Sequence, residues 1–479
     1  MIAETYKITK TKVFAEASLF GTDYSEQVLM TNYQKYLYPT QPNQKFYGVI
    51  NSDDLYQALL KMCKNTVSEH EREMQNKTIE KWLCEQGGRF SKDQLVRNLG
   101  EYYKPRTINR RMIRKIRRIF LDYFIPEVSK CPDPGIRDRW TLVRRYKADH
   151  KSDGGITYFG DRRDAVNIYR CLTSAKRMPL AYNPIIAGMR YKDGKFRNIF
   201  NDDLSNYYRE NMVYGVFFDW VHTLYFDNHY SDQELADLIY SFRARYAYAG
   251  DYEAMDQHVT LDAALEIVNM LCDLFGCDNS FRSFACMSTE ELFTTDLIVA
   301  DELWKGLHNL FSGIYPTHDL ESIINIAILL AVLTDAGYRV VMQPKVLRAH
   351  EAALLVCGDD SVILFGSKPK DIDRIARLHR IYSRAFGQVM EYSKVEHGAE
   401  TITFCKKTFA LRPGIKSFKQ TNRGTPIWKY PVLKCINALY RPENIPIFPE
   451  YRDLLAWWCS IMDCCQGCTA WKPAVIMIA

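Results

Sequence analysis

The sequence predicts an α+β fold, a mixture of helices with an antiparallel sheet, and three observations support this prediction. A short β-prone segment, Tyr246 to Gly250, runs directly into Asp251. Two apolar segments, residues 352–357 and 361–365, flank the tripeptide Gly358-Asp359-Asp360, whose Gly-Asp step favours a tight hairpin turn. Several other stretches space their apolar residues three or four positions apart, as amphipathic helices do.

The clearest helical pattern in the N-terminal half covers residues 107–124. Its apolar residues recur at 112/113, 116, 119/120 and 123/124, and arginines and lysines from Arg110 to Arg118 fill the other face. Further helices are expected at 71–84, 203–245, 261–275, 371–386, from 430 onward and, after a loop, at 312–333. Basic loops or hairpins are expected at 139–164 and 190–197, and another strand at 401–405.

Length and composition set limits on the kind of protein. The chain has 479 residues, which is room for two or three domain-sized units or one multi-lobed enzyme. Hydrophobic content of 47% and charged content of 25% fit a soluble globular protein, and the 14 cysteines are expected to be reduced thiols. The net charge is only +6, so nucleic-acid binding must rely on local basic patches. The apolar stretch Ile323 to Leu333 is too short to cross a bilayer, so no membrane partner is expected.

Asp251 and the Asp359-Asp360 pair are the candidate catalytic residues. A carboxylate at a strand end projects where a hard cation can reach it, and adjacent carboxylates in a tight turn repel each other unless solvent or a cation compensates. If the fold brings them together, they can hold two Mg²⁺ ions, which is the chemistry of nucleotidyl transfer. Two plainer interpretations stay open. Asp251 closes a turn or caps a helical turn, and Gly358-Asp359-Asp360 belongs to a surface hairpin.

Three motifs in order carry a resemblance to a known family: Asp251-x4-Asp256, Ser312-Gly313 before a helix, and Gly358-Asp359-Asp360 in a hairpin. Over roughly residues 185–410 the chain resembles viral RNA-dependent RNA polymerases. It is most similar to those of small double-stranded RNA viruses of the partitivirus and picobirnavirus type. The resemblance implies a right-hand polymerase with fingers, palm and thumb around an enclosed cleft, and an antiparallel palm sheet. The implied domains are an N-terminal extension bridging fingers and thumb (1–60), fingers (61–218), palm (219–265), a fingers insert (266–306), palm (307–408), and thumb with C-terminal tail (409–479).

The resemblance also implies roles for the acidic residues. Asp251 and Asp359 match the family's two shared metal ligands, and Asp360 matches a weaker acidic position beside them. Asp256 matches the residue that contacts the ribose of the incoming nucleotide. The implied cofactor is Mg²⁺, for which Mn²⁺ can substitute.

One matching nucleotide-binding segment follows residue 311. Ser312, Gly313 and Thr317 match the family's Ser-Gly-x3-Thr loop and helix, and Asn325 matches a later Asn on that helix. Glu321 departs from the pattern, because the family commonly has Asn or Asp there as a second sugar sensor. Taken alone, the segment is equally a Ser-Gly turn followed by a helix N-cap.

Basic segments on either side complete the resemblance. Arg190, Lys195 and Arg197 lie in a segment similar to the family's nucleotide-entry hairpin, where cationic groups draw in and orient the triphosphate. Lys394 matches a lysine that protonates the leaving pyrophosphate, although an ordinary surface lysine fits the sequence as well. Lys406 and Lys407 match a turn that contacts the backbone of the nascent RNA. The basic helix at 107–118 is either a template contact or a solvated surface.

The expected function is therefore RNA-dependent RNA polymerase activity, which transcribes and replicates a double-stranded RNA genome. The expected partners are an RNA template, nascent RNA, NTPs and a viral capsid protein, and the expected location is the virion interior and the host cytoplasm. Two alternatives stay open, a reverse transcriptase-like polymerase and a non-catalytic RNA-binding viral protein. Reverse transcriptases typically place a bulky aromatic residue where Asp256 stands, so the sequence favours ribonucleotides.

Overall fold

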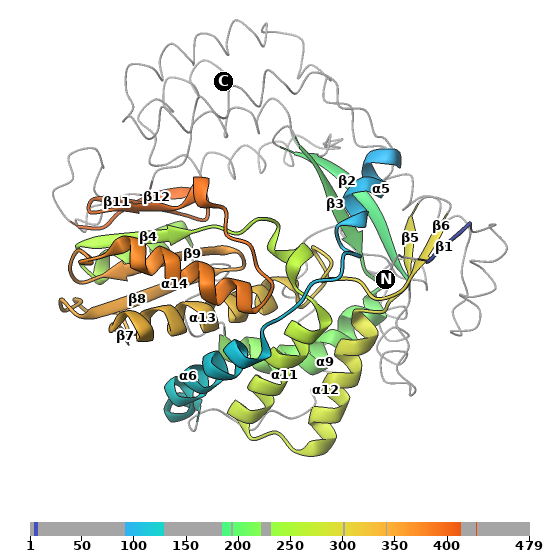
Figure 1. Cartoon of the computed structure of the whole chain (residues 1–479), viewed down its shortest axis with the longest axis horizontal. Helices are drawn as coiled ribbons and strands as arrows, with labels where there is room; N and C mark the ends of the chain where they lie inside the picture. Colours follow the sequence, from blue (N-terminus) through green and yellow to red (C-terminus); the bar gives the residue numbers. More distant parts are fainter. Residues whose placement is uncertain are drawn as a thin grey trace, which may run out of the picture.

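The structure is a computed structural model that describes residues 4–7, 92–128, 184–192, 195–221, 231–299, 302–341, 343–412 and 428. Its strands form two five-stranded sheets and one two-stranded sheet, and its helices pack around them (Figure 1). The expected α+β composition is therefore present. The helices expected at 71–84 and from 430 onward, and the basic segment 139–164, lie outside the described residues.

The central sheet has the strand order β10-β4-β9-β8-β7. Its strands are β4 (Tyr246–Gly250), β7 (Arg339–Val341), β8 (Glu351–Cys357), β9 (Asp360–Phe365) and β10 (Glu396–Gly398). All neighbouring pairs are antiparallel except β7 and β8, which run parallel. The prediction of an antiparallel sheet thus holds for four strands and misses the parallel edge strand. Pairing of β4 with β9 puts both acidic segments at one end of this sheet.

Side chains alternate between the two faces of the central sheet, because successive residues of a strand point to opposite sides. On one face, Tyr248, Leu354 and Ile363 pack with the long helices into a large hydrophobic core. On the other face, Leu355 and Val362 belong to a second core. The second core also contains residues from α10 (Asp232–Ser241) and from the β11–β12 hairpin (Thr401–Phe404 and Lys407–Ala410). Strands β4, β8 and β9 are therefore buried on both faces, which explains their nearly continuous apolar sequences.

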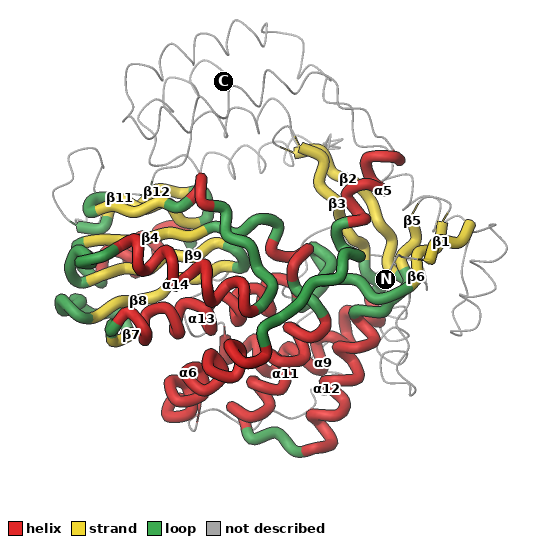
Figure 2. The backbone as a smooth tube through the Cα atoms, viewed as in Figure 1, coloured by secondary structure: helices red, strands yellow, loops and turns green. Residues whose placement is uncertain are grey.

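Helices α13 (Thr317–Ala336) and α14 (Ile372–Ala385) lie on the first face of the sheet, and α6 (Arg110–Val128) and α11 (Leu261–Phe275) pack against α13. Helix α13 lies at the centre and is buried from Leu320 to Leu333, and apolar residues cover most of its surface, apart from Glu321, Ser322 and Asn325 near its N-terminal end. Figure 2 shows α6, α11, α9 and α12 grouped on one side of the sheet and the β11–β12 hairpin on the other. The sheet is thus the middle layer between helices and a hairpin.

The second five-stranded sheet has the order β1-β6-β5-β2-β3. Its strands are β1 (Glu4–Lys7), β2 (Ile185–Lys192), β3 (Lys195–Asn201), β5 (Leu297–Val299) and β6 (Glu302–Lys305). Helices α5 (Lys92–Gly100), α9 (Leu204–Val221) and α12 (Asn279–Leu292) complete the described part. Short elements between β4 and α13, including α12, β5 and β6, were not predicted from the sequence.

Most of the local predictions agree with these bounds. The helix predicted at 261–275 is α11, the hairpin at 352–365 is β8–β9, and the basic segment 190–197 belongs to the β2–β3 hairpin. Three expected domain boundaries fall inside continuous elements: 218/219 in α9, 265/266 in α11 and 408/409 in β12. No helix in the described ranges is long and apolar enough to span a membrane.

Candidate functional site

The two acidic segments meet at one end of the central sheet. Strand β4 ends at Gly250, which is paired with Ser361 on β9, so Asp251 follows on one strand where Asp360 precedes on the other. Cys357 and Asp360 are partners across the hairpin, and Gly358 and Asp359 form the turn between them. Residues from positions 251, 359 and 360 are therefore neighbours through strand pairing, although they lie far apart in the sequence.

The turn has a backbone conformation that favours glycine. Gly358 has φ +59°, in the left-handed region that residues with a Cβ atom rarely adopt. A methyl group built on Gly358 would also lie 3.1 Å from His318 Nδ1 and 3.5 Å from Glu321 Oε2. The N-terminal turns of α13 therefore pack directly against the acidic hairpin.

Burial and the neighbouring negative charges raise the pKa values of Asp359 and Asp360. Burial raises the pKa of Asp360 to about 7, and the negative charges of Asp359 and Asp251 add to this rise. Burial also raises the pKa of Asp359, and the negative charge of Asp251 adds to this rise. Such a group of carboxylates favours the approach of cations.

Two lysines supply positive charge at this end of the sheet. Lys394 Nζ lies 2.6 Å from Asp251 Oδ2 and 2.6 Å from Glu391 Oε2. Burial opposes the charged form of Lys394, but the hydrogen bonds to Asp251 and Glu391 outweigh this effect and raise its pKa. Lys406 lies in the β11–β12 turn, is exposed, and opposes the rise in the pKa of Asp360. Lys407, by contrast, forms an ion pair with Asp232 at the start of α10.

The turn is held from behind by α13. Ser322 Oγ accepts a hydrogen bond of 2.8 Å from the backbone N–H of Gly358. Asn325 Nδ2 donates to the carbonyl oxygens of Gly358 at 3.2 Å and of Asp359 at 3.4 Å. Asn325 has no exposed surface, and its remaining oxygen accepts a hydrogen bond from Tyr252. The Asn325 amide therefore contacts the acidic turn itself.

Asp256 and Glu321 lie close to the acidic hairpin. Tyr102 donates a hydrogen bond of 2.5 Å to Asp256 Oδ2. Burial raises the pKa of Asp256, and the charge of Asp359 contributes. Glu321 is buried, and burial followed by the charges of Asp256 and Asp359 raises its pKa well above the usual value. Glu321 thus faces the same space as the sequence-predicted acids, even though it departs from the family pattern.

The Ser312-Gly313 segment forms the loop that leads into α13. Gly313 is exposed and has φ +90°, and Ser312 is half-buried. Thr317 begins α13, and its hydroxyl donates a hydrogen bond of 2.7 Å to the carbonyl of Phe311, so it closes the loop on itself. Thr317 makes no side-chain N-cap bond, since the N-cap position is Pro316.

The basic hairpin is formed by β2 and β3. Arg190 pairs directly with Arg197, and Lys192 pairs with Lys195. The backbone register therefore places positions 190 and 197 directly opposite each other. The Arg197 side chain is exposed. The hairpin belongs to the second sheet, beside the strand β5 that follows α12.

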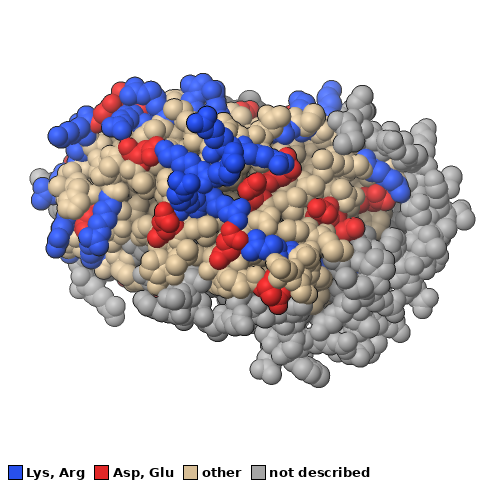
Figure 3. All heavy atoms as spheres, turned by 60° about the horizontal axis from the view of Figure 1, so that its bottom comes forward, with Lys and Arg blue, Asp and Glu red and all other residues tan. Residues whose placement is uncertain are grey.

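Helix α6 packs by its apolar side against α11, α13 and α14 and exposes a basic face. Arg111, Arg114 and Arg118 are exposed and have no ion-pair partner among the described residues. Their spacing of three and four positions puts them on one side of the helix. Figure 3 shows a dense group of Lys and Arg side chains on the side of the molecule where α6 lies.

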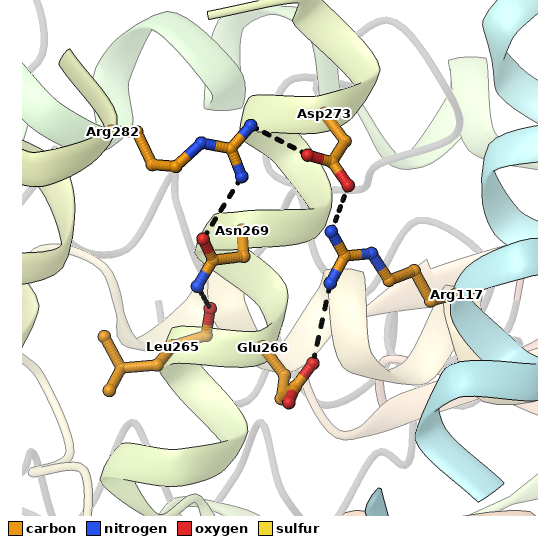
Figure 4. A network of polar contacts seen from close by, with 6 residues as sticks. All are labelled: Arg117, Leu265, Glu266, Asn269, Asp273 and Arg282. Atoms are coloured by element: carbon orange, nitrogen blue, oxygen red, sulfur yellow. Dashed lines mark hydrogen bonds and ion pairs between the residues drawn. The ribbon is translucent and has the colours of Figure 1, made fainter. Parts of the chain in front are cut away.

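Ion pairs hold the flank of α6 against the neighbouring helices. Arg117 bridges Glu266 and Asp273 of α11, and Asp273 also accepts a hydrogen bond of 2.7 Å from Arg282 of α12 (Figure 4). Arg282 donates a second bond, of 3.2 Å, to Asn269. The position of α6, and of its exposed arginines, is therefore fixed by a charged network as well as by the core.

No group of three or more His, Cys, Asp or Glu side chains within the described ranges is arranged closely enough to enclose a metal ion by itself. The carboxylates of Asp251, Asp359 and Asp360 nevertheless suit a hard divalent cation, because they are oxygen donors gathered at one end of the sheet. Such a cation would relieve the repulsion that burial intensifies.

Sequence reasoning missed the residues that support the site. Tyr102, Tyr252, Ser322 and His379 all bond to residues of the site or to their supports. His379 could have been noticed because it interrupts the apolar face of an amphipathic helix, between Ile375 and Tyr382. Tyr102 carries no comparable signal.

Comparison with known proteins gives one kind of match. No protein-family model matches the sequence, and no curated protein sequence is significantly similar to it. Among solved structures, the RNA-dependent RNA polymerase of a human picobirnavirus aligns with 92% of this chain and 84% of its own, at a TM-score of 0.65 and 14% identity. An insertion-loop deletion mutant of the same polymerase aligns with 90% of this chain and 85% of its own, at a TM-score of 0.64 and 14% identity. The chain therefore has the fold of a viral RNA-dependent RNA polymerase.

Proposed function

We propose that this protein is an RNA-directed RNA polymerase that adds NTPs to an RNA 3′ end on an RNA template, for transcription and replication of a double-stranded RNA genome. One observation carries the proposal. Asp251 and the Asp359-Asp360 pair come from distant segments and converge at one end of a sheet whose overall fold matches that of a viral polymerase. Fold alone leaves the chemistry open, whereas this juxtaposition of carboxylates suits phosphoryl transfer.

In this proposal the central sheet with α11, α13 and α14 is the palm. The second sheet, with the β2–β3 hairpin, belongs to the fingers, and the chain after β12 begins the thumb. The cleft is proposed to be enclosed by the segment 1–60 between fingers and thumb, of which only residues 4–7 belong to the described part of the chain. Because α9, α11 and β12 are continuous, the domain boundaries lie at the ends of these elements rather than inside them.

We assign the metal-binding role to Asp251 and Asp359, with Asp360 as a weaker ligand beside them. Bound Mg²⁺ ions, or Mn²⁺ in their place, would favour ionisation of the attacking 3′-hydroxyl and neutralise the triphosphate and the leaving pyrophosphate. The strand pairing between β4 and β9 keeps these carboxylates at fixed relative positions. Because the carboxylates repel one another in the free protein, their electrostatic free energy favours cation binding.

The nucleotide-binding role belongs to the residues around this hairpin. Arg190, Lys195 and Arg197 receive the triphosphate, and Ser312 and Gly313 form the mobile turn beside the template base. Asp256 contacts the ribose. Its position near Asp359, together with the hydrogen bond from Tyr102, supports this assignment.

The α13 residues have distinct parts in the same proposal. Glu321 is a second sugar contact, supported by its proximity to Asp256. Thr317 stabilises the loop by its bond to Phe311. Asn325 reaches the nucleotide only indirectly, because its amide is engaged with the Gly358-Asp359 turn.

Two lysines complete the chemistry. Lys394 donates a proton to pyrophosphate, and its ion pair with Asp251 supports a place next to the reacting groups. Lys406 contacts the backbone of the nascent RNA, which its exposure near Asp360 supports. Lys407 contributes less to RNA binding than Lys406, since its ammonium group is paired with Asp232.

The proposed partners are template RNA, nascent RNA, NTPs and a viral capsid protein, and the proposed location is the virion interior and the host cytoplasm. The exposed arginines of α6 form a second candidate contact for RNA phosphates, because they have no acidic partner among the described residues.

Primer extension on a short RNA template with Mg²⁺ tests the proposal. The wild-type protein should incorporate NTPs and should discriminate against dNTPs. Reactions with and without a primer are compared. Asp359→Ala should abolish incorporation and leave RNA binding intact, whereas Asp373→Ala, an exposed aspartate of α14, should behave as wild type. Preferential use of dNTPs would favour a reverse transcriptase-like enzyme. RNA binding without incorporation by the wild type would favour a non-catalytic RNA-binding protein.

A further inference from the structure

His379 of α14 is a buried histidine with a partner at each ring nitrogen. It has no exposed surface, its Nε2 lies 2.9 Å from the Tyr252 hydroxyl, and its Nδ1 lies 3.2 Å from the Tyr248 hydroxyl. Burial lowers the pKa of His379 to about 3, so the ring is neutral at physiological pH. A neutral imidazole has one N–H donor and one acceptor nitrogen, so the two tyrosines must take opposite roles.

The direction of these hydrogen bonds follows from the next partner. Tyr252 donates its single hydroxyl proton to Asn325 Oδ1 at 3.2 Å. It therefore accepts from His379, whose Nε2 carries the proton. Nδ1 is then the acceptor, and Tyr248 donates to it. The result is a chain with one direction, from Tyr248 through His379 and Tyr252 to Asn325.

This chain ends on the catalytic turn. Asn325 Nδ2 makes the last hydrogen bonds of the chain, because it donates to the carbonyl oxygens of Gly358 and Asp359. The carbonyl groups of the turn are thereby connected to α14, although α14 carries none of the residues assigned to nucleotide or metal binding. Cooperative chains of this kind are stronger in a buried environment than the same bonds in water.

His379 also contacts the other acidic segment. A Cβ atom built on Gly250 would lie 2.6 Å from His379 Cε1, so the imidazole ring lies against the backbone one residue before Asp251. Only glycine leaves room for the ring at this place. One side chain thus touches the end of β4 directly and reaches the β8–β9 turn through Tyr252 and Asn325.

We propose that His379 is a positioning residue that sets the position of Asp251 relative to Asp359. This inference rests on the proposed polymerase function, in which both carboxylates hold the metal ions. Residues that orient metal ligands from behind typically change metal affinity or activity by about 10- to 100-fold when they are lost. A side chain that only filled the core would change stability without a specific change in metal dependence.

Two matched substitutions separate these roles. Tyr252→Phe and Tyr248→Phe each remove one buried tyrosine hydroxyl bonded to His379, but only Tyr252 continues the chain to Asn325. In primer extension, Tyr252→Phe should lower kcat by about tenfold or more and raise the Mg²⁺ concentration for half-maximal activity, with the KM for NTP little changed. Tyr248→Phe should lower the melting temperature about as much as Tyr252→Phe does, but it should keep the wild-type kcat and Mg²⁺ dependence.

Substitution of the histidine itself supplies a rescue test. The amide nitrogen of His379→Gln can still donate toward Tyr252, whereas His379→Leu has a similar volume and no donor. The glutamine variant should retain more activity than the leucine variant at saturating Mg²⁺.

Each result has a defined meaning. Equal kcat and equal Mg²⁺ dependence in Tyr252→Phe and Tyr248→Phe would overturn the positioning role and leave the polymerase function standing, provided Asp359→Ala is inactive. A folded wild-type protein that adds no nucleotide with Mg²⁺ or Mn²⁺ would overturn the proposed function and this inference with it.

Discussion

Lys394 forms an ion pair with Asp251 in which its ammonium nitrogen lies 2.6 Å from a carboxylate oxygen. The lysine follows a short segment, residues 389–391, that pairs with the backbone of residues 251–253 directly after β4. The proposed proton donor is therefore tied to the proposed metal ligand by both side chain and backbone.

Lys394→Gln should reduce the rate of nucleotide addition by about 100-fold, because positioned acids typically contribute factors of that order. The raised pKa of Lys394 means that the ammonium form predominates at neutral pH. The wild-type rate of nucleotide addition should therefore not fall through deprotonation of Lys394 as the pH rises from about 6 to about 8. Single-nucleotide addition measured by rapid quench gives the rate.

Lys394→Arg is the informative comparison. Arginine keeps the positive charge beside Asp251 but hardly releases a proton, so the Arg variant should be nearly as slow as the Gln variant. Full activity of the Arg variant would show that Lys394 acts through its charge alone.

Tyr102 should influence sugar selection through its hydrogen bond to Asp256. Asp256→Ala should reduce the preference for NTP over dNTP, and Tyr102→Phe should do so less strongly, since it frees the carboxylate without removing it. Competition between ATP and dATP on one template measures the preference. Tyr103→Phe is a matched control because the Tyr103 hydroxyl has no hydrogen-bond partner among the residues that the structure describes, and it should leave selectivity unchanged.

The exposed arginines of α6 should contribute to RNA binding through phosphate contacts. Replacing Arg111, Arg114 and Arg118 together by alanine should weaken binding to a short RNA. The slope of log K against log salt should become shallower by roughly 2 to 3, because each phosphate contact contributes about 0.7 to 0.9. Fluorescence anisotropy between 50 and 200 mM salt, a range chosen from the usual salt dependence, measures both quantities.

A second triple variant controls for charge alone. Arg243, Arg245 and Arg339 are also exposed, and their replacement by alanine removes the same charge from other elements. If both triple variants change the slope equally, the effect is general electrostatics and α6 has no special role.

Glu210 should make the stability of the protein depend on pH. The buried carboxyl group of Glu210 lies beside that of the half-buried Asp202, within hydrogen-bonding reach, which favours a proton shared between the two carboxyl groups. Burial and then the charge of Asp202 raise the pKa of Glu210 well above its usual value. A carboxyl group with a raised pKa in the folded state stabilises the protein at low pH, and this contribution is lost as the pH rises through the folded-state pKa.

Wild-type stability should therefore fall as the pH rises above about 4, where the unfolded glutamate ionises. Glu210→Gln cannot ionise and still donates to Asp202, so at pH 8 it should be more stable than wild type by roughly 1 kcal/mol or more. Thermal unfolding between pH 5 and pH 8 tests this, with the exposed Glu290→Gln as control. A stability difference that does not change with pH would argue against the shared proton.

Local features of the fold could be predicted because they depend on neighbours in the sequence. The spacing of apolar residues identified α11 and α14, and the Gly358-Asp359 turn between apolar strands identified the β8–β9 hairpin. The short strands β5, β6 and β7 escaped prediction because each has only three or four residues, too few to show a period.

The roles of individual side chains were harder to foresee. Lys407 is basic and follows a turn, yet it pairs with Asp232 of α10. Asn325 has the type and spacing of a nucleotide contact, yet its amide is bonded to the backbone of the turn. A polar side chain forms hydrogen bonds or ion pairs with whichever group the packing brings within reach. The spacing of residues in the sequence does not predict which group that is.

By itself, the sequence determined the acidic segments and the helices and hairpin that carry them. Only the tertiary structure decided that Asp251 would adjoin Asp360, and that His379 would lie between their supports. The physical reason is that these contacts depend on the register of β4 with β9 and on the packing of α14 against that sheet. Both arise from burial of the whole core, to which residues distant in the chain contribute together.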